Sequence, residues 1–264
     1  DALERQVERL QQEQESAVEG GSRDDTGGTT GAQSSSGDER SPTDALSETD
    51  CLVRYETRAG GTIDSLLEGE ATTEAVHENL RIETNTTFDV ERTTVDGVPF
   101  ETFLAGSLER RVVGWLLCDL PTEIVATDGR DALADLVDAL PAVDRIGFQE
   151  TVDLEAIGEE PLEEEAPETV GFDLVAWGSD GHPRVVADLN RSTDPVGEGP
   201  VSSLIARGKS VASGTDLAAV LFATDGYYEA DARRAVEATT GGGLLARDSR
   251  ASYVKMTRKR GFHC

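Results

Sequence analysis

Two aspartates flank a predicted hairpin turn at a spacing that would let them share a divalent cation. Residues 172–190 read FDLVAWGSDGHPRVVADLN, with Asp173 near the start and Asp188 near the end. The apolar segments on either side of the Asp180-Gly181 pair are typical of two strands joined by a tight turn. Carboxylate oxygens that converge from two rigid strands are suitable ligands for a divalent cation.

The turn also predicts which residues face each other across the hairpin. A two-residue type I′ turn, or a four-residue loop with the same centre, places Asp173 directly opposite Asp188. Directly opposite side chains share one face of a sheet, with Cβ atoms about 5 Å apart, and Asn190 lies on that face. Two facing carboxylates repel unless a cation, a proton or solvent relieves them. The pair therefore indicates either a metal site or a solvated polar face, and a bulge that shifts the register by one is a third interpretation.

The elements that would position these aspartates follow an α/β order. Apolar residues have helical spacing between residues 100 and 141, and three strands follow within residues 145–190. Next come a helix at 201–214, a strand at 217–225, a helix at 229–240 and a last strand from residue 253. We expect a mixed sheet, in which an antiparallel three-strand meander is followed by parallel strands joined through helices.

The composition divides the chain into three parts. Residues 1–19 carry apolar side chains at heptad spacing and are predicted to be the end of a coiled coil, through which the chain could form a homo-oligomer. Residues 20–46, rich in Gly, Ser and Thr, predict a disordered linker. Residues 47–264 form the predicted α/β domain, with 47–107 as an N-terminal extension and 108–264 as the core. Because the chain starts without methionine and stops inside an apparent strand, we expect it to be a piece of a larger protein.

The charge balance is strongly acidic. The 264 residues include 52 acidic and 24 basic side chains, which give a net charge of −28, and only three of the basic residues are lysines. This composition resembles that of proteins from extreme halophiles, where high salt screens self-repulsion. In that case the acidity is an adaptation to a salty solvent and does not indicate a binding partner. It is therefore only weak evidence against nucleic-acid binding.

The remaining bulk features exclude several classes of protein. Three widely spaced cysteines predict reduced thiols in a cytoplasmic protein, and the three histidines form no zinc-binding motif. No apolar stretch is long enough for a membrane span, so no membrane partner is expected.

Residues 247–263, near the end of the chain, form a basic stretch that contrasts with this acidity. It contains a single acid, Asp248, and two of the three lysines. Its candidate nucleic-acid-binding residues are Arg250, Lys255, Arg258, Lys259 and Arg260. Cationic side chains in a row can contact a phosphate backbone, although the same residues could instead pair with the abundant carboxylates of the chain.

The order of helix, three-strand meander, helix and strand over residues 108–264 resembles the restriction-endonuclease-like superfamily. The superfamily motif is an aspartate on the second strand, then an acidic residue, any residue and a lysine on the third. Asp173 and Asp188 match its acidic positions, and the resemblance implies that they bind Mg²⁺ and act in catalysis. Asn190 stands where the motif has the lysine that stabilises charge on phosphate. Lys209, on the following helix, is the candidate replacement.

The chain also resembles the C-terminal region of a haloarchaeal family of uncharacterised multidomain proteins. The composition, the linker and the stretches FDLVAWGSDGHPRVVADLNRSTDP and GGGLLARDSRASYVKMTRKRGFHC carry this second resemblance. Because Asn190 replaces the lysine, we expect a non-catalytic module that binds nucleic acid or a protein. The alternatives are a metal-dependent nuclease that uses Asp173, Asp188 and Lys209, and a structural coiled-coil scaffold.

Overall fold

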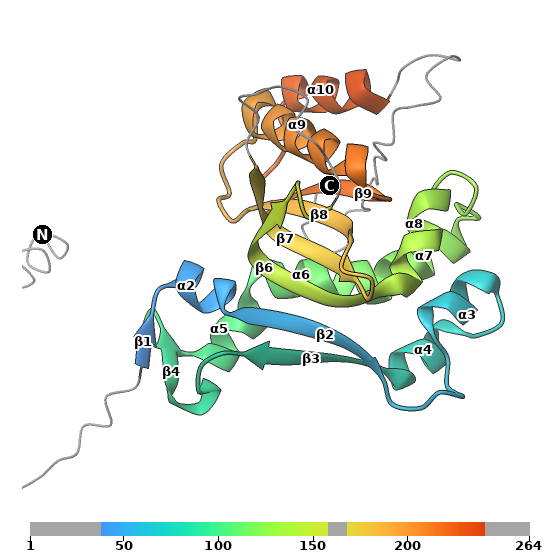
Figure 1. Ribbon diagram of the computed structural model, residues 1–264, viewed down its shortest axis with the longest axis horizontal. Coiled ribbons are helices and arrows are strands. Elements are labelled where there is room, and N and C mark those ends of the chain that lie inside the picture. The colour runs from blue at the N-terminus through green and yellow to red at the C-terminus, as the bar shows by residue number, and fades with distance from the viewer. Residues whose placement is uncertain (1–37, 158–167, 241–264) are drawn as a thin grey trace, which may run out of the picture. The chain divides into compact units, whose positions relative to one another are not determined.

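A computed structural model describes residues 38–157 and 168–240, which form a mixed α/β structure (Figure 1). The strands are β1 (Asp38–Arg40), β2 (Thr49–Tyr55), β3 (Leu80–Thr86), β4 (Thr93–Val95), β5 (Val98–Pro99), β6 (Val143–Asp153), β7 (Thr169–Gly178), β8 (Pro183–Asn190) and β9 (Ala219–Thr224). The helices are α2 (Pro42–Ser47), α3 (Ile63–Glu68), α4 (Thr73–Asn79), α5 (Phe100–Gly106), α6 (Leu108–Gly114), α7 (Leu120–Ala126), α8 (Ala134–Ala139), α9 (Glu198–Gly214) and α10 (Ala230–Thr240). A π-helical segment, Trp115–Asp119, joins α6 to α7, and 3₁₀ turns cover Val90–Arg92 and Leu140–Ala142.

Six of the strands form one mixed sheet in the order β3-β2-β6-β7-β8-β9, and β1, β4 and β5 form a smaller one. Within the large sheet, β6, β7 and β8 are the predicted antiparallel meander. The pair β8 and β9 is parallel, as expected for two strands joined through a helix, here α9. β2 pairs with β6, so strands from residues 47–107, the segment predicted as an extension, lie in the same sheet as the meander.

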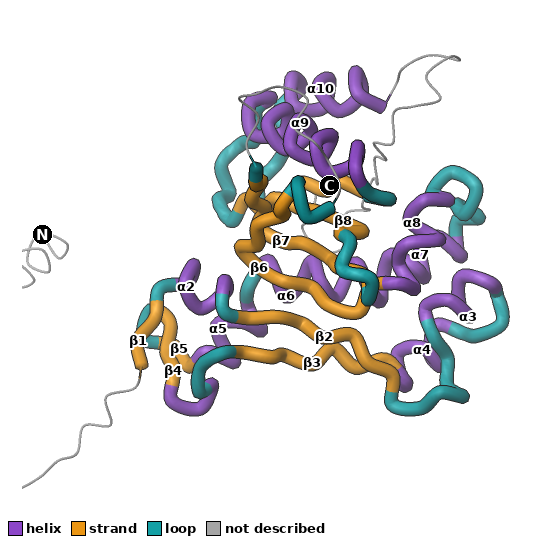
Figure 2. The backbone as a smooth tube through the Cα atoms, viewed as in Figure 1, coloured by secondary structure: helices purple, strands orange, loops and turns teal. Residues whose placement is uncertain are grey.

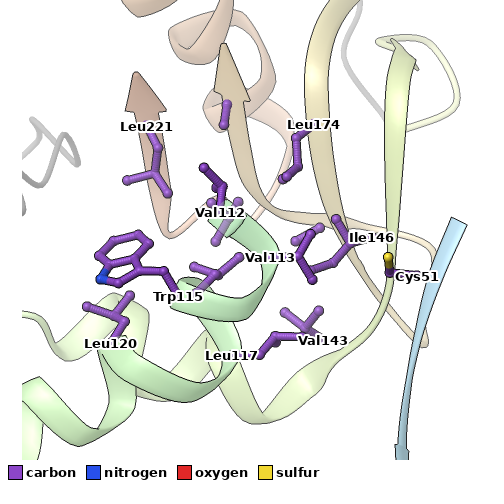
Figure 3. Packing of buried hydrophobic residues seen from close by; sticks show 14 of the residues in the cluster. Cys51, Val112, Val113, Trp115, Leu117, Leu120, Val143, Ile146, Leu174 and Leu221 are labelled. Carbon is purple, nitrogen blue, oxygen red and sulfur yellow. The ribbon is translucent and has the colours of Figure 1, made fainter. Parts of the chain in front are cut away.

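Helices cover both faces of the sheet at β7, β8 and β9 (Figures 1 and 2). On one face, helices α5 to α8 and the π-helical segment between them pack on the strands. Figure 3 shows this core, in which Val113 lies between Trp115 and Leu120 on one side and Ile146 and Leu174 on the other. On the other face, α9 packs on β7, β8 and β9 through Leu204 and Val211, and α10 packs beside α9.

Two of the cysteines belong to this core. Cys51 and Cys118 are free thiols; Cys51 is fully buried on β2 (Figure 3), and Cys118 is partly buried. Burial raises the pKa of Cys51 to about 11 and also raises the pKa of Cys118. Both thiols are therefore protonated near neutral pH and behave as apolar groups.

The structured part begins earlier in the chain than predicted. β1 and α2 lie within residues 38–47, whereas the predicted linker extended to residue 46. Ser41 caps α2 by accepting a hydrogen bond from the N–H of Asp44, and Ala45 and Leu46 are buried. A short apolar segment with a good cap was enough to order residues that the overall composition assigned to the linker. The predicted coiled-coil end at 1–19, the linker up to residue 37, the basic stretch and the last strand lie outside the described residues.

The turn between β7 and β8 differs from the expected type I′ turn. The N–H of Gly181 donates to the carbonyl of Gly178, and the N–H of Gly178 donates to the carbonyl of His182. Gly181 has a φ of 81°, whereas Asp180 does not have a positive φ, so this is a three-residue loop with a left-handed glycine. A bulge between Ala176 and Trp177 then restores the predicted register, in which Leu174 pairs with Ala187.

Candidate functional site

The large sheet divides at the level of Asp173. Along the described chain, β7 pairs with β8 only as far as Leu174 and Ala187. Beyond that point β7 continues alongside β6 to the pair Thr169 and Asp153, and β8 continues alongside β9 to Asn190. We call this place the fork; the predicted register would put Asp173 opposite Asp188 there.

The Asp173 carboxylate holds the two branches of the fork together. Its Oδ2 accepts a hydrogen bond of 2.7 Å from the backbone N–H of Leu189 on β8. Its Oδ1 accepts another, also 2.7 Å, from the side-chain amide of Gln149 on β6. The side chain thus takes the place of a backbone carbonyl just where the ladder between β7 and β8 ends.

Gln149 has an unusual backbone for a residue inside a strand. Its φ is 51°, in the left-handed region that costs a non-glycine residue about 1–2 kcal/mol. Side-chain alternation reverses here in both paired strands. Phe148 and Leu174 face the core under α5 to α8, and beyond the reversal Val152 and Phe172 face α9.

The Asp188 carboxylate is paired with an arginine from α9. The Arg207 guanidinium donates from Nη2 to Oδ2 of Asp188 and from Nη1 to the carbonyl of Gly171 on β7. It also lies over the ring of Phe172, with Cζ 5.1 Å from the ring centroid. Arg207 therefore bridges the two branches of the fork, and the side chains of Asp188 and Arg207 are only 19% and 29% exposed.

Opposing effects act on the protonation of Asp188. Burial raises its pKa above the usual range, and the neighbouring charge of Asp173 adds to this rise. The hydrogen bond and charge of Arg207 act in the opposite direction, but burial prevails. The pair of facing acids predicted from the sequence is thus relieved by a guanidinium and by hydrogen bonds.

Lys209 and Asn190, the other two residues to which the nuclease resemblance pointed, do not contact the two aspartates in the described hydrogen bonds and ion pairs. Lys209 is exposed on α9, and Arg207 is the cation that contacts Asp188 among the described side chains. Asn190 donates to Thr224 Oγ1 on β9 and accepts from the N–H of Ser192, so it fixes the loop after β8. The asparagine therefore has a local structural role at the end of its strand.

Two ion pairs that were not predicted from the sequence join α6 to the ends of the parallel strands. Arg191, just after β8, contacts Glu109, whose side chain is only 1% exposed. Arg111 contacts both carboxylate oxygens of Asp225, just after β9, at 2.7–2.8 Å. These pairs hold the carboxyl ends of both strands against α6, and no local pattern in the sequence indicates them.

A polar cluster on β6 and β7 was missed in the same way. Arg145 contacts Glu150 at 2.6 Å and Asp50 of β2 at 2.7 Å. The Trp177 indole also donates to Glu150, which lies over Gly147 where a Cβ would come within 2.2 Å of the carboxylate. The reversal at Gln149 is what brings Glu150 to the face of Arg145.

The acidic pair at the fork does not fit a Mg²⁺ site in this arrangement. Both oxygens of Asp173 accept protein hydrogen bonds, and Asp188 is paired with Arg207. Within residues 38–157 and 168–240, no three His, Cys, Asp or Glu side chains are placed so that they could hold a metal ion. A hard cation needs several free oxygen ligands, which these two side chains do not offer.

Comparison with known families gives one match. The model of a domain of unknown function, DUF7527, matches residues 40–264. The chain belongs to the DUF7527 family. The match begins within β1 and includes the fork and α9, so the domain boundary agrees with the start of the described structure. Searches of curated proteins and of solved structures found no match.

The expectation about membranes can be compared with the described part of the DUF7527 domain, whereas the candidate nucleic-acid-binding residues lie beyond it. No helix in the described ranges is long and apolar enough to cross a membrane. The five candidate nucleic-acid-binding residues, Arg250, Lys255, Arg258, Lys259 and Arg260, lie outside those ranges, although the family match includes them.

Proposed function

We propose that the DUF7527 domain is a non-catalytic interaction module built on a nuclease-like core. The observation that carries the proposal is the Arg207 bridge, in which one guanidinium contacts Asp188 on β8 and the Gly171 carbonyl on β7. A nuclease needs these acids to bind a cation that neutralises charge on phosphate. Here the charge of Asp188 is already neutralised from inside the protein.

The nuclease-like part of the proposal rests on topology. The support is the antiparallel meander β6-β7-β8, followed by α9 and the parallel strand β9, which is the order of elements on which the resemblance to the restriction-endonuclease-like superfamily was based. Asp173 lies on the second strand of the meander and Asp188 on the third, where the proposed likeness expects the two acidic residues. A domain with a nuclease-like fold can have a binding surface without the chemistry, because the fold does not itself require the metal.

We propose nucleic acid as the partner. The support is the basic stretch of the sequence, in a chain whose overall net charge is −28. Phosphate contacts by arginine and lysine provide most of the affinity of non-specific nucleic-acid binding. A protein partner is the alternative outcome of the same experiment.

The experiment measures binding of labelled DNA and RNA to the full chain over a range of salt concentrations. Arg258→Glu with Lys259→Glu should weaken binding at least about tenfold and reduce the steepness of the salt dependence. The matched control is Arg233→Glu with Arg234→Glu, which reverses two arginines on α10 and should leave affinity unchanged. Equal affinity for all three proteins, or no binding even at low salt, would contradict a nucleic-acid partner.

A further inference from the structure

One edge of the large sheet is open along its whole described length. β3 is the terminal strand, and all seven of its residues pair with β2 on the other side. No described strand pairs with the outer edge of β3, which runs along one margin of the sheet in Figure 1. Natural proteins commonly block edge strands with a bulge, a proline or charged side chains, especially lysines. β3 contains no bulge, proline or lysine, and its charged residues are one arginine and one glutamate, Arg81 and Glu83.

Two-fold symmetry allows only a few ways to pair such an edge with its own copy. Side chains directly opposite in an antiparallel pair share one face. A two-fold axis perpendicular to the sheet leaves each side chain on the same face in both copies. The pairing must therefore place one residue of the first copy opposite the same residue of the second copy. Near the middle of β3, which runs from Leu80 to Thr86, the central residue can therefore be Arg81, Ile82, Glu83 or Thr84.

Charge selects one of these four registers. Centring on Thr84 would place Glu83 opposite Asn85 and would give no attractive pair of charges. Centring on Arg81 would place two arginines opposite each other, and centring on Glu83 would place two glutamates opposite each other. Centring on Ile82 places Arg81 of each copy opposite Glu83 of the other, which gives two attractive pairs on the exposed face. On the opposite face the two Ile82 side chains, each packed against its own core, would meet across the junction.

Arg81 is able to take part in such a pair. It contacts Glu56 at 2.8 Å, with 45% and 59% of the two side chains exposed. Exposed ion pairs of this kind contribute little stability, so Arg81 can exchange partners at low cost. Glu83 is also exposed.

We propose that a second copy of this chain pairs with β3, antiparallel and centred on Ile82, so that the two six-stranded sheets become continuous. Main-chain hydrogen bonds would provide the attraction, as in other cases of strand addition. The Arg81–Glu83 pairs would select the register. This interface is separate from the predicted coiled coil and does not depend on whether the fork binds a metal or a nucleic acid.

The test is a charge swap in the full chain, with self-association measured by sedimentation. Arg81→Glu or Glu83→Arg alone places like charges opposite each other twice and should weaken association about tenfold. The double swap restores both attractive pairs and should return the affinity to that of the original chain. Arg54→Glu is the matched control, because Arg54 is exposed on β2 next to Arg81 but is one strand away from the edge.

A cross-linking readout keeps the test valid if another segment also associates. Under mild oxidation, the double variant Arg81→Cys with Glu83→Cys should form a disulfide that joins position 81 of one chain to position 83 of the other, identified by mass spectrometry. Neither single cysteine variant should give a β3–β3 disulfide, because each new thiol then faces a charged residue. The proposal is overturned if the double cysteine variant does not form this disulfide, or if the swap series changes association no more than Arg54→Glu does.

Discussion

Gln149 and Asp173 face each other on β6 and β7 at the level where the side-chain alternation of both strands reverses. The Gln149 amide donates to Asp173 Oδ1 over 2.7 Å, and the other oxygen of Asp173 accepts the N–H of Leu189. A residue with positive φ and a carboxylate that accepts two hydrogen bonds thus mark the point where the sheet divides. The arrangement makes Asp173 a structural acceptor, which is why we assign no metal to it.

The first prediction concerns the left-handed backbone of Gln149. Gln149→Gly and Gln149→Ala both remove the hydrogen bond to Asp173, but only glycine adopts a φ of 51° without strain. The alanine variant should therefore be less stable than the glycine variant by about 1 kcal/mol. Denaturant unfolding of both variants measures the difference. The usual order inside a strand, with alanine the more stable, would contradict the assigned backbone.

The second prediction concerns the coupling between Arg207 and Asp188. Arg207→Met leaves the partly buried Asp188 without its charged partner and should lower the free energy of unfolding by about 1–3 kcal/mol. Asp188→Asn should lower it less, because burial disfavours the Asp188 charge that this substitution removes. Arg207→Met keeps an unbranched stem that can still pack against Phe172, so the loss reports mainly on the charge. The double variant should be more stable than the sum of the single effects implies, by about 1–2 kcal/mol.

Additive single and double effects would show that the two side chains do not interact in solution. A matched control is Lys209→Met, because Lys209 lies two residues away on α9 and is exposed. This substitution should change stability by less than about 0.5 kcal/mol.

The third prediction follows from the raised pKa of Asp188. A carboxyl whose pKa is higher in the folded than in the unfolded state binds its proton more tightly when folded. Its contribution to stability is therefore fully present below the unfolded pKa and is lost as the pH rises through the folded pKa. Burial causes the shift, Asp173 on β7 adds to it, and Arg207 on α9 opposes it. Because many other carboxylates titrate in this range, only a difference between variants isolates Asp188.

Unfolding of the original chain and of Asp188→Asn should be compared across the acidic range. The difference in stability, original minus variant, should decrease as the pH rises through the folded pKa of Asp188. In an Arg207→Met background the folded pKa is higher, so the decrease should extend to higher pH. A difference that increases with pH would mean that Arg207 prevails over burial.

Much of this architecture follows from sequence pattern. The strands β6, β7 and β8, the parallel pair β8 and β9, and the register of Leu174 with Ala187 all match the prediction. The register was correct although the turn was not of the predicted type, because the bulge near Trp177 compensates for the three-residue loop. The loop and the bulge shift the register in opposite directions, so the alternation of apolar residues does not reveal either of them.

The cation at the fork is Arg207, and its position on α9 is a signal that the sequence contains. Leu204, Gly208 and Val211 are buried positions of α9, and Arg207 lies beside them at helical spacing, whereas Lys209 is exposed. An arginine beside an otherwise apolar helix stripe indicates a partner inside the protein. The position of Arg207 around the helix therefore predicts the partner of Asp188 better than the resemblance to a nuclease, which pointed to Lys209. The left-handed Gln149 has no comparable signal, because glutamine is not a residue that favours this conformation.

The most direct test of the central claim is a cleavage assay on DNA and RNA with Mg²⁺ and Mn²⁺, at salt concentrations from dilute to multimolar. The matched variants are Asp188→Ala and Asp173→Ala, with the fold of each confirmed by its unfolding transition. We predict that no metal-dependent cleavage above background is found for the original chain and that neither variant changes the result. Cleavage by the original chain that requires the metal and is lost in Asp188→Ala would contradict the account, because a cation would then have to displace Arg207 from Asp188.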